Sequence, residues 1–129
     1  MTKAKAFPLP RIHSQYAGGE MMGVMAGENG APDYLLIHMG NSPNHVTFEK
    51  ALNWSRTTSG EEGPTPRELQ MLMANRRKGQ FNSVGHWSSA PYAGGERFAW
   101  MQYFDNGDQD YDHKDDDYVA VAVRRVPFQ

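Results

Sequence analysis

Two segments near the C-terminus, 97–104 and 118–126, carry β-strand patterns that limit what this chain can fold into. Both carry the period-two or continuous apolar pattern of a strand, in which Trp100, Gln102 and Phe104 share one face of the first segment and Val119, Val121 and Val123 share one face of the second. The connection FDNGDQDYDHKDDDY (104–118) contains seven aspartates and one lysine, and it leaves room for a further strand around Tyr111. The chain must therefore form a sheet here and keep a dense run of acids solvated beside it.

Three more strand patterns, at 21–28, 33–40 and 85–89, extend the expected sheet. The first two are separated by NGAP. The dipeptide Asn29-Gly30 is a strong hairpin signal because both residues tolerate positive φ. We therefore expect a hairpin near the N-terminal end of the sheet.

Two helices are predicted between these strands. In 41–60, Thr47 is a natural N-cap and apolar residues follow at helical spacing, but the third helical position lacks the acid that completes a capping box. In 65–79, Thr65 and Glu68 form the full capping-box pattern, with proline at the first helical position. The second helix is the best-signalled element of the chain.

The length of 129 residues fits one domain. We expect residues 1–20 to form an extended N-terminal arm and residues 21–129 to form the folded domain. No apolar run reaches the ~18 residues that cross a bilayer, and the N-terminus lacks the apolar core of a secretory signal. The absence of cysteine excludes disulfides and thiol chemistry. Synthesis in the cytoplasm without a signal peptide is expected, and insertion into a membrane is not.

The charge of the acidic stretch disfavours nucleic acid as a partner. Its seven aspartates and one lysine give a net charge of −6, whereas the whole chain carries −2. Phosphates would be repelled by such a surface. We therefore expect no nucleic-acid partner.

As a metal site, the stretch reproduces the opening of a calcium loop. Asp108, Asp110 and Asp112 have the required spacing, but His113 stands where that loop needs glycine and Val119 where it needs glutamate. An EF-hand is rejected on these two positions. A different oxygen-rich calcium site stays open without a recognisable motif, so we predict no cofactor and name no metal ligand.

No enzyme signature appears in the chain. The five histidines lack compact metal-ligand spacing, Ser88 and Ser89 lie outside a Gly-x-Ser-x-Gly motif, and no phosphate-binding glycine loop is present. The spacing of the aspartates singles out no catalytic pair. We predict a protein without enzymatic activity and without catalytic residues.

As a binding surface, the acidic stretch has a suitable composition. Tyrosine supplies rigid contact area, while Asp, Asn and His supply adaptable hydrogen bonds, as in antibody-type binding sites. The same mixture suits sugars; a merely solvated hairpin is the alternative. The predicted contact residues are Tyr103, Asp105, Asn106, Asp108, Asp110, Tyr111, Asp112, His113 and Asp115. The predicted scaffold residues beneath them are Trp87, Trp100, Phe104, Val121 and Val123.

Four motifs in order, GPTPREL (63–69), HWSS (86–89), FAWMQYFDNG (98–107) and VAVRR (121–125), give the chain a family resemblance. It resembles the Lcl C-terminal domain family of bacterial adhesins, prophages and phages over about residues 20–126. One departure is Pro66, which takes the place of the family's arginine.

This resemblance implies an α+β fold of the C-type lectin-like kind, with two helices packed on a small twisted antiparallel sheet. Lectin-like targets of diversity-generating retroelements are similar in crowding Asp, Asn, Tyr and His near the C-terminus, since the codons of these residues differ only in the first base. A hypervariable surface at 103–118 is one reading of this crowding, and a fixed acidic hairpin is the other.

Together these observations predict a non-enzymatic module that binds a ligand or receptor, as part of a phage or prophage virion (associated with a tail fibre) or of an adhesin. The expected partners are a cell-surface glycan or protein receptor and, through the N-terminal arm, a virion or fibre protein. The resemblance also implies frequent trimers, so a homotrimer is one expected state. The expected location is a virion or a cell surface. The alternatives are a purely structural virion or decoration protein and an enzyme acting on polysaccharide.

Overall fold

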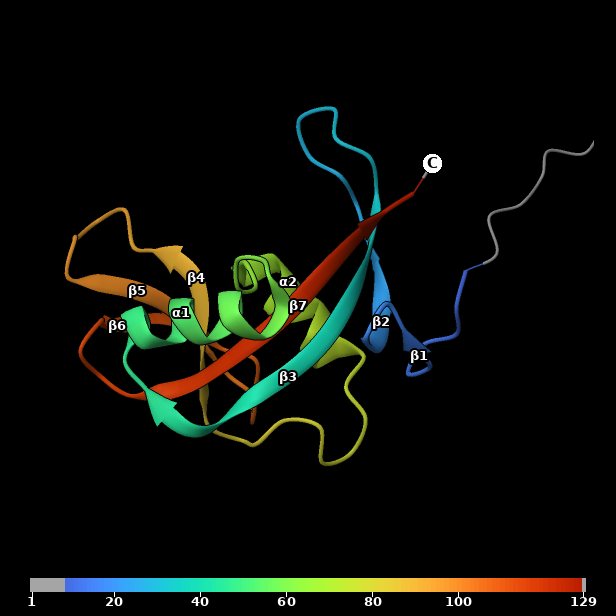
Figure 1. Ribbon diagram of the computed structural model, residues 1–129. Coiled ribbons are helices and arrows are strands. Elements are labelled where there is room, and N and C mark those ends of the chain that lie inside the picture. The colour runs from blue at the N-terminus through green and yellow to red at the C-terminus, as the bar shows by residue number, and fades with distance from the viewer. Residues whose placement is uncertain (1–8, 129) are drawn as a thin grey trace, which may run out of the picture.

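The computed structural model of this protein describes residues 9–128. The strands are β1 (Gln15–Tyr16), β2 (Gly19–Met25), β3 (Tyr34–Val46), β4 (Gly85–Pro91), β5 (Phe98–Tyr103), β6 (Gln109–His113) and β7 (Tyr118–Pro127). The helices are α1 (Phe48–Ser59) and α2 (Pro66–Ala74). All seven strands form one sheet in the order β1-β2-β3-β7-β4-β5-β6 (Figure 1).

The two longest strands, β3 and β7, form the antiparallel centre of the sheet. Their pairing extends along β3 from Tyr34 to Val46. On the other side of β7 lies β4, which runs parallel to it and pairs through His86 and Val119. The parallel contact arises because the chain leaves β3, forms both helices and returns to the sheet beyond β7.

The helices pack on opposite faces of the sheet. Neighbouring residues of a strand point to opposite faces. In β7, Ala120 packs with Phe48 and Ala51 of α1, whereas Val121 and Val123 belong to the cluster that includes the buried leucines of α2. In Figure 1, α1 runs beside β7. The core is therefore divided by the sheet into two layers.

Both predicted helix starts are confirmed. Thr47 precedes α1 without making a side-chain cap bond. Thr65 precedes α2 and forms the predicted capping box: its hydroxyl accepts from the Glu68 N–H, and the Glu68 carboxylate accepts from the Thr65 N–H. The helices are shorter than predicted, since 41–46 belongs to β3 and α2 ends at Ala74. Within residues 9–128, no helix is long and apolar enough to cross a membrane.

The predicted hairpin at Asn29-Gly30 is confirmed. Both residues have positive φ, 55° and 82°, and the strands on either side, β2 and β3, pair antiparallel. The strand patterns at 85–89, 97–104 and 118–126 correspond to β4, β5 and β7, and the space left around Tyr111 holds β6.

The predicted fold class, α+β with two helices packed on a small antiparallel sheet in the C-type lectin-like manner, is wrong. The sheet dominates the molecule with seven strands, it is mixed because of the β4–β7 pair, and the helices are short. Local patterns underestimated the sheet because 41–46 contains Pro43 and Gln109–His113 is acidic, and both features disfavour strands. These segments are strands because distant residues pair with them.

The expected N-terminal arm, residues 1–20, is described only in part, since residues 1–8 lie outside the described residues. Gln15 and Tyr16 pair with Glu20 and Gly19 at the start of β2. The sheet therefore begins within this segment.

Candidate functional site

The candidate site lies at one edge of the sheet, on the hairpin that β5 and β6 form. β6 is the last strand of the sheet and pairs only with β5 among the described strands. Directly opposed residues in an antiparallel pair project to the same face. Trp100 opposite Tyr111 and Phe98 opposite His113 therefore share one face of the hairpin.

The predicted contact residues do not form one surface, because the strand divides them between two faces. Tyr111 and His113 lie on the face of Trp100, which is also the α2 face of the sheet. Asp110 and Asp112 lie on the α1 face, opposite Met101 and Ala99, which belong to the core cluster of α1.

Tyr103 also lies on the α1 face, two residues along β5 from Met101. Its ring meets that of Tyr118 edge to face at 6.4 Å. The structure thus separates Tyr103 from Tyr111, although both tyrosines are exposed, by 36% and 43%.

The remaining predicted residues lie in the turns of the hairpin. In the β5–β6 turn, Asn106 accepts from the Asp108 N–H at 2.9 Å and donates to the Asp108 carboxylate at 3.1 Å. Asp105 is exposed in the same turn, and Asp115 is exposed in the turn after β6. Of these turn residues, Asn106 and Asp108 bond to each other.

Five rings from three segments meet on the face of Tyr111, and we call them the aromatic row: Tyr92, Phe98, Trp100, Tyr111 and His113. The phenol rings of Tyr92 and Tyr111 stack at 4.0 Å with 8° between their planes. Trp100 stands edge to face against both, at 5.4 and 5.9 Å. Phe98 contacts Tyr111 at 5.6 Å and His113 at 4.5 Å. Edge-to-face and stacked contacts stabilise such a group and fix its shape.

The aromatic row remains accessible. Tyr111 and His113 are exposed, and Tyr92, Phe98 and Trp100 are half-buried. At the His113 end, a shallow pocket of about 410 Å³ adjoins the row and is lined by Glu96, Arg97, His113, Lys114 and Asp115. We call it the end pocket. Aromatic area and groups of both charges therefore meet at this edge.

Two aspartates of β6 have a local backbone role. The outward-facing N–H of Tyr111 donates to the Asp110 carboxylate, and the N–H of His113 donates to the Asp112 carboxylate, each at 2.8 Å. Unpaired N–H groups of an edge strand are places where another strand can add. These carboxylates occupy them.

Asp112 also ties β6 to β7. The hydroxyl of Tyr118 donates a short hydrogen bond to its carboxylate. Although partial burial raises the pKa of Asp112, hydrogen bonds from Tyr118 and from the carboxyl of Asp116 give a net lowering. The bond to Asp112 raises the pKa of Asp116, as expected where like charges crowd together.

Sequence reasoning missed two members of the aromatic row and misassigned a third. Period-two alternation in 97–104 places Phe98 and Trp100 on one face, and this signal was sufficient to find Phe98. Trp100 is half-buried in the row rather than buried beneath it. No local signal marks Tyr92, which follows β4 and reaches the row through the loop that returns to β5.

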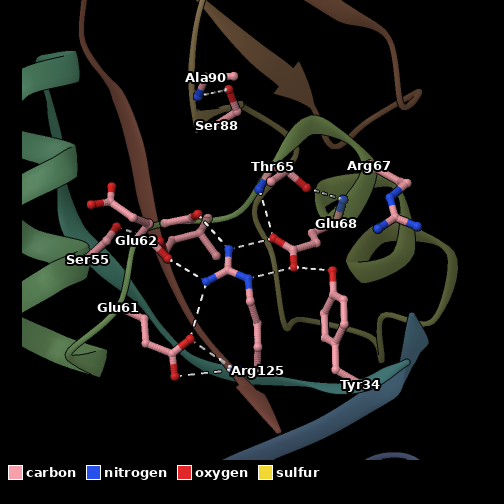
Figure 2. A network of polar contacts seen from close by, with 12 residues as sticks. Tyr34, Ser55, Glu61, Glu62, Thr65, Arg67, Glu68, Ser88, Ala90 and Arg125 are labelled. Atoms are coloured by element: carbon pink, nitrogen blue, oxygen red, sulfur yellow. Dashed lines mark hydrogen bonds and ion pairs between the residues drawn. The ribbon is translucent and has the colours of Figure 1, made fainter. Parts of the chain in front are cut away.

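A second group of polar side chains, around Glu68 and Arg125, is buried and structural. Figure 2 shows Arg125 of β7 reaching Glu68 of α2, while Tyr34 of β3 approaches the same carboxylate. Arg125 donates to Glu68 at 2.7 and 2.8 Å, and Tyr34 donates to it at 2.6 Å. Burial raises the pKa of Glu68, but the bonds from Arg125 hold it below the usual value. Burial and the bond to Glu68 raise the pKa of Tyr34 to about 12. Every group has its partner, so the cluster joins three elements rather than presenting a reactive atom.

The histidines of the core form a third polar group. His38 is held by Gln80 and Asn41, at 2.9 and 2.7 Å. His86 is fully buried and bonds through Nδ1 to the Val84 carbonyl, whereas its Nε2 has no hydrogen-bond partner among the residues that the structure describes. Burial lowers the pKa of both rings. These are neutral core histidines.

No set of three His, Asp or Glu side chains within residues 9–128 is placed to hold a metal ion. Asp110 and Asp112 instead accept hydrogen bonds from the backbone of their own strand. The open calcium site and the absence of a cofactor stay predictions.

No protein-family model matches this chain, and no curated protein matches it in sequence. The resemblance to the Lcl C-terminal domain family stays a prediction.

Proposed function

We propose that this protein is a non-enzymatic binding module that holds its ligand against the aromatic row and the end pocket. The observation that carries the proposal is the convergence of Tyr92, Phe98, Trp100, Tyr111 and His113 from three segments onto one accessible face. Aromatic rings that pack one another and remain exposed supply contact area at low entropic cost. The proposal assigns no chemical reaction to any side chain in the row or the pocket.

The proposed setting is a phage or prophage virion or a bacterial adhesin, with the N-terminal segment joining the module to a fibre protein or to sister subunits. Its support is the order of the sequence motifs at 63–69, 86–89, 98–107 and 121–125. The ligand in this setting is a cell-surface glycan or a protein receptor.

A purely structural role is the second candidate, and one observation favours it. Asp110 and Asp112 accept from the outward N–H groups of β6, so part of the acidic stretch protects the sheet edge without a ligand. A structural role explains why Asp110 and Asp112 are present, but it does not explain why the Tyr111 ring is exposed. The two candidates therefore differ over the exposed ring.

Tyr111 and Tyr103 provide a matched test, since both are exposed tyrosines of the same hairpin on opposite faces. Adsorption of the protein to bacterial cells, arrayed surface polysaccharides and arrayed surface proteins would be compared for wild type, Tyr111→Ala and Tyr103→Ala. Loss of a central aromatic contact costs roughly 1–2 kcal/mol, or about tenfold or more in affinity. We expect that loss for Tyr111→Ala and a change within about twofold for Tyr103→Ala. Equal behaviour of the two variants, each folded by circular dichroism, would favour the structural role.

A further inference from the structure

The charge around the aromatic row is negative, although the row itself is neutral. Seven aspartates and one lysine lie in 104–118, which gives −6. The single lysine of this segment, Lys114, places its ammonium over the Phe48 ring on the α1 side, 5.7 Å from the centroid. Asp110 and Asp112 project to the α1 face, and the acids that adjoin the row are Glu96 and Asp115 of the end pocket. The net negative charge of the hairpin still favours opposite charge on a ligand that approaches the row.

Accessible aromatic rings add a specific preference to this field, although Tyr92 covers one face of Tyr111. An ammonium group is attracted to the face of tryptophan or tyrosine, with tryptophan the strongest. Trp100 and Tyr111 both contribute to the accessible face. Rings and carboxylates together thus recognise a cation better than a neutral group.

The end pocket indicates what carries that cation. The residues Glu96, Arg97, His113, Lys114 and Asp115 line one shallow depression, although the ammonium of Lys114 lies over the Phe48 ring. Such a lining offers hydrogen-bond donors and acceptors side by side. A sugar residue, whose hydroxyls both donate and accept and whose ring face can lie on an aromatic ring, satisfies it.

The edge of the sheet argues against an extended peptide as the occupant. A peptide that adds to a sheet bonds to the free backbone groups of the edge strand. The outward N–H groups of Tyr111 and His113 are already taken by the carboxylates of Asp110 and Asp112. Two of the backbone donors that such a peptide would need are therefore already occupied.

We infer that the ligand of the aromatic row is a glycan that carries free amino groups, with a sugar residue in the end pocket. This inference rests on the proposed binding function and names its ligand class. It assigns recognition of the amine to the Trp100 and Tyr111 rings and to the carboxylates of Glu96 and Asp115.

Two sugar tetramers with the same linkage test the inference. The tetramer of glucosamine carries free amino groups, and in the tetramer of N-acetylglucosamine these amino groups are acetylated. Affinities would be measured by isothermal titration calorimetry at about pH 6, where amines are protonated. We expect the glucosamine tetramer to bind about tenfold more tightly, and added salt to weaken it selectively. The double variant Glu96→Gln/Asp115→Asn should bring the ratio close to one. Glu49→Gln/Asp117→Asn, which removes equal charge from exposed positions outside the row and the pocket, should keep most of it.

Three outcomes would overturn the inference. The acetylated tetramer could bind as well as or better than the amine. Tetralysine could bind more tightly than the glucosamine tetramer and lose that affinity in Tyr111→Ala, which would indicate a cationic peptide. In the third outcome, neither tetramer binds, but the protein still adsorbs to cells or arrayed ligands in a way that depends on Tyr111. This result would reject the amino glycan as the ligand and would leave the proposed binding function standing. If the wild type adsorbed to no cell or array and to neither tetramer, the binding function itself would fail.

Discussion

Glu68 and Arg125 face each other through two parallel hydrogen bonds, from Arg125 Nε at 2.8 Å and from Nη2 at 2.7 Å. The carboxylate is fully buried, and the guanidinium also reaches the carbonyl oxygens of Glu62 and Gly63. One charged pair thereby fixes the start of α2, strand β7 and the segment between the helices. A charge left alone in such a place is far less stable than the pair.

The first prediction follows from this pair. Glu68→Gln should lower the free energy of unfolding by about 3 kcal/mol, because Arg125 would lose the buried carboxylate that it binds through two hydrogen bonds and keep only the longer, 3.4 Å pair with Glu61. Urea denaturation followed by circular dichroism measures the loss. The control is Glu62→Gln, which breaks the exposed pair with Arg56 and should cost much less than Glu68→Gln. Comparable losses in the two variants would show that the buried pair contributes nothing beyond a surface one.

A second prediction compares the two N-cap threonines. Thr65 accepts from the N–H of Glu68 at 3.2 Å, whereas Thr47 makes no side-chain cap bond. Thr65→Ala should therefore destabilise the protein by about 1 kcal/mol, and Thr47→Ala by clearly less. The same urea titration tests both. A larger loss at Thr47 would contradict the assignment of the capping bond.

These local features are the ones that the sequence made predictable. Thr47 and Thr65 mark helix starts and Asn29-Gly30 marks a turn because the signal and its structural consequence lie within a few residues of each other. The length of β3 had no such signal. Its continuation through Pro43 depends on a shift in register between Asn41 and His45, opposite β7. The hydroxyl of Ser42 accepts from the Ala120 N–H at 2.8 Å in this region. A proline in a strand is accommodated where such an irregularity removes the need for its N–H.

The candidate site divides in the same way. Alternation along 97–104 predicts that Phe98 and Trp100 share a face, and the acidic stretch pointed to Tyr111 and His113. That these two pairs meet depends on the register of β5 against β6, which alternation alone leaves open. Tyr92 joins them from a loop, and its place depends on packing rather than on any pattern.

A third prediction concerns acid. Burial lowers the pKa of His86 to about 4, against about 6.5 in an unfolded chain. As the pH falls, His86 therefore binds a proton near pH ~6.5 in the unfolded state but only near pH ~4 in the folded state. Stability from this residue is complete above pH ~6.5 and falls by about 3 kcal/mol as the pH drops to ~4.

The variant His86→Leu should remove most of this slope between pH ~6.5 and ~4, with His38 accounting for part of what remains. Its stability at pH ~7 should fall by about 1 kcal/mol because the Val84 carbonyl loses its donor. The exposed His45 supplies the control, since His45→Gln should keep the wild-type slope. Urea midpoints at several pH values measure all three proteins. A slope unchanged in His86→Leu would rule out this histidine as its source.

The last prediction concerns the outer edge of β6. Here it tests whether the acidic stretch protects the edge strand, as the structural role proposes. Asp110 and Asp112 accept from the N–H groups of Tyr111 and His113, so Asp110→Ala/Asp112→Ala should free two edge donors. An edge strand with free donors recruits other strands, and we expect concentration-dependent self-association in sedimentation velocity. The variant also loses the Tyr118–Asp112 bond, so some loss of stability should accompany it. Asp105→Ala/Asp117→Ala removes the same two charges from exposed positions and should stay in the wild-type state of association. Self-association of both variants would show that it results from the lower net charge. Self-association of the first variant alone would show that the carboxylates of Asp110 and Asp112 prevent it by occupying the backbone donors of β6.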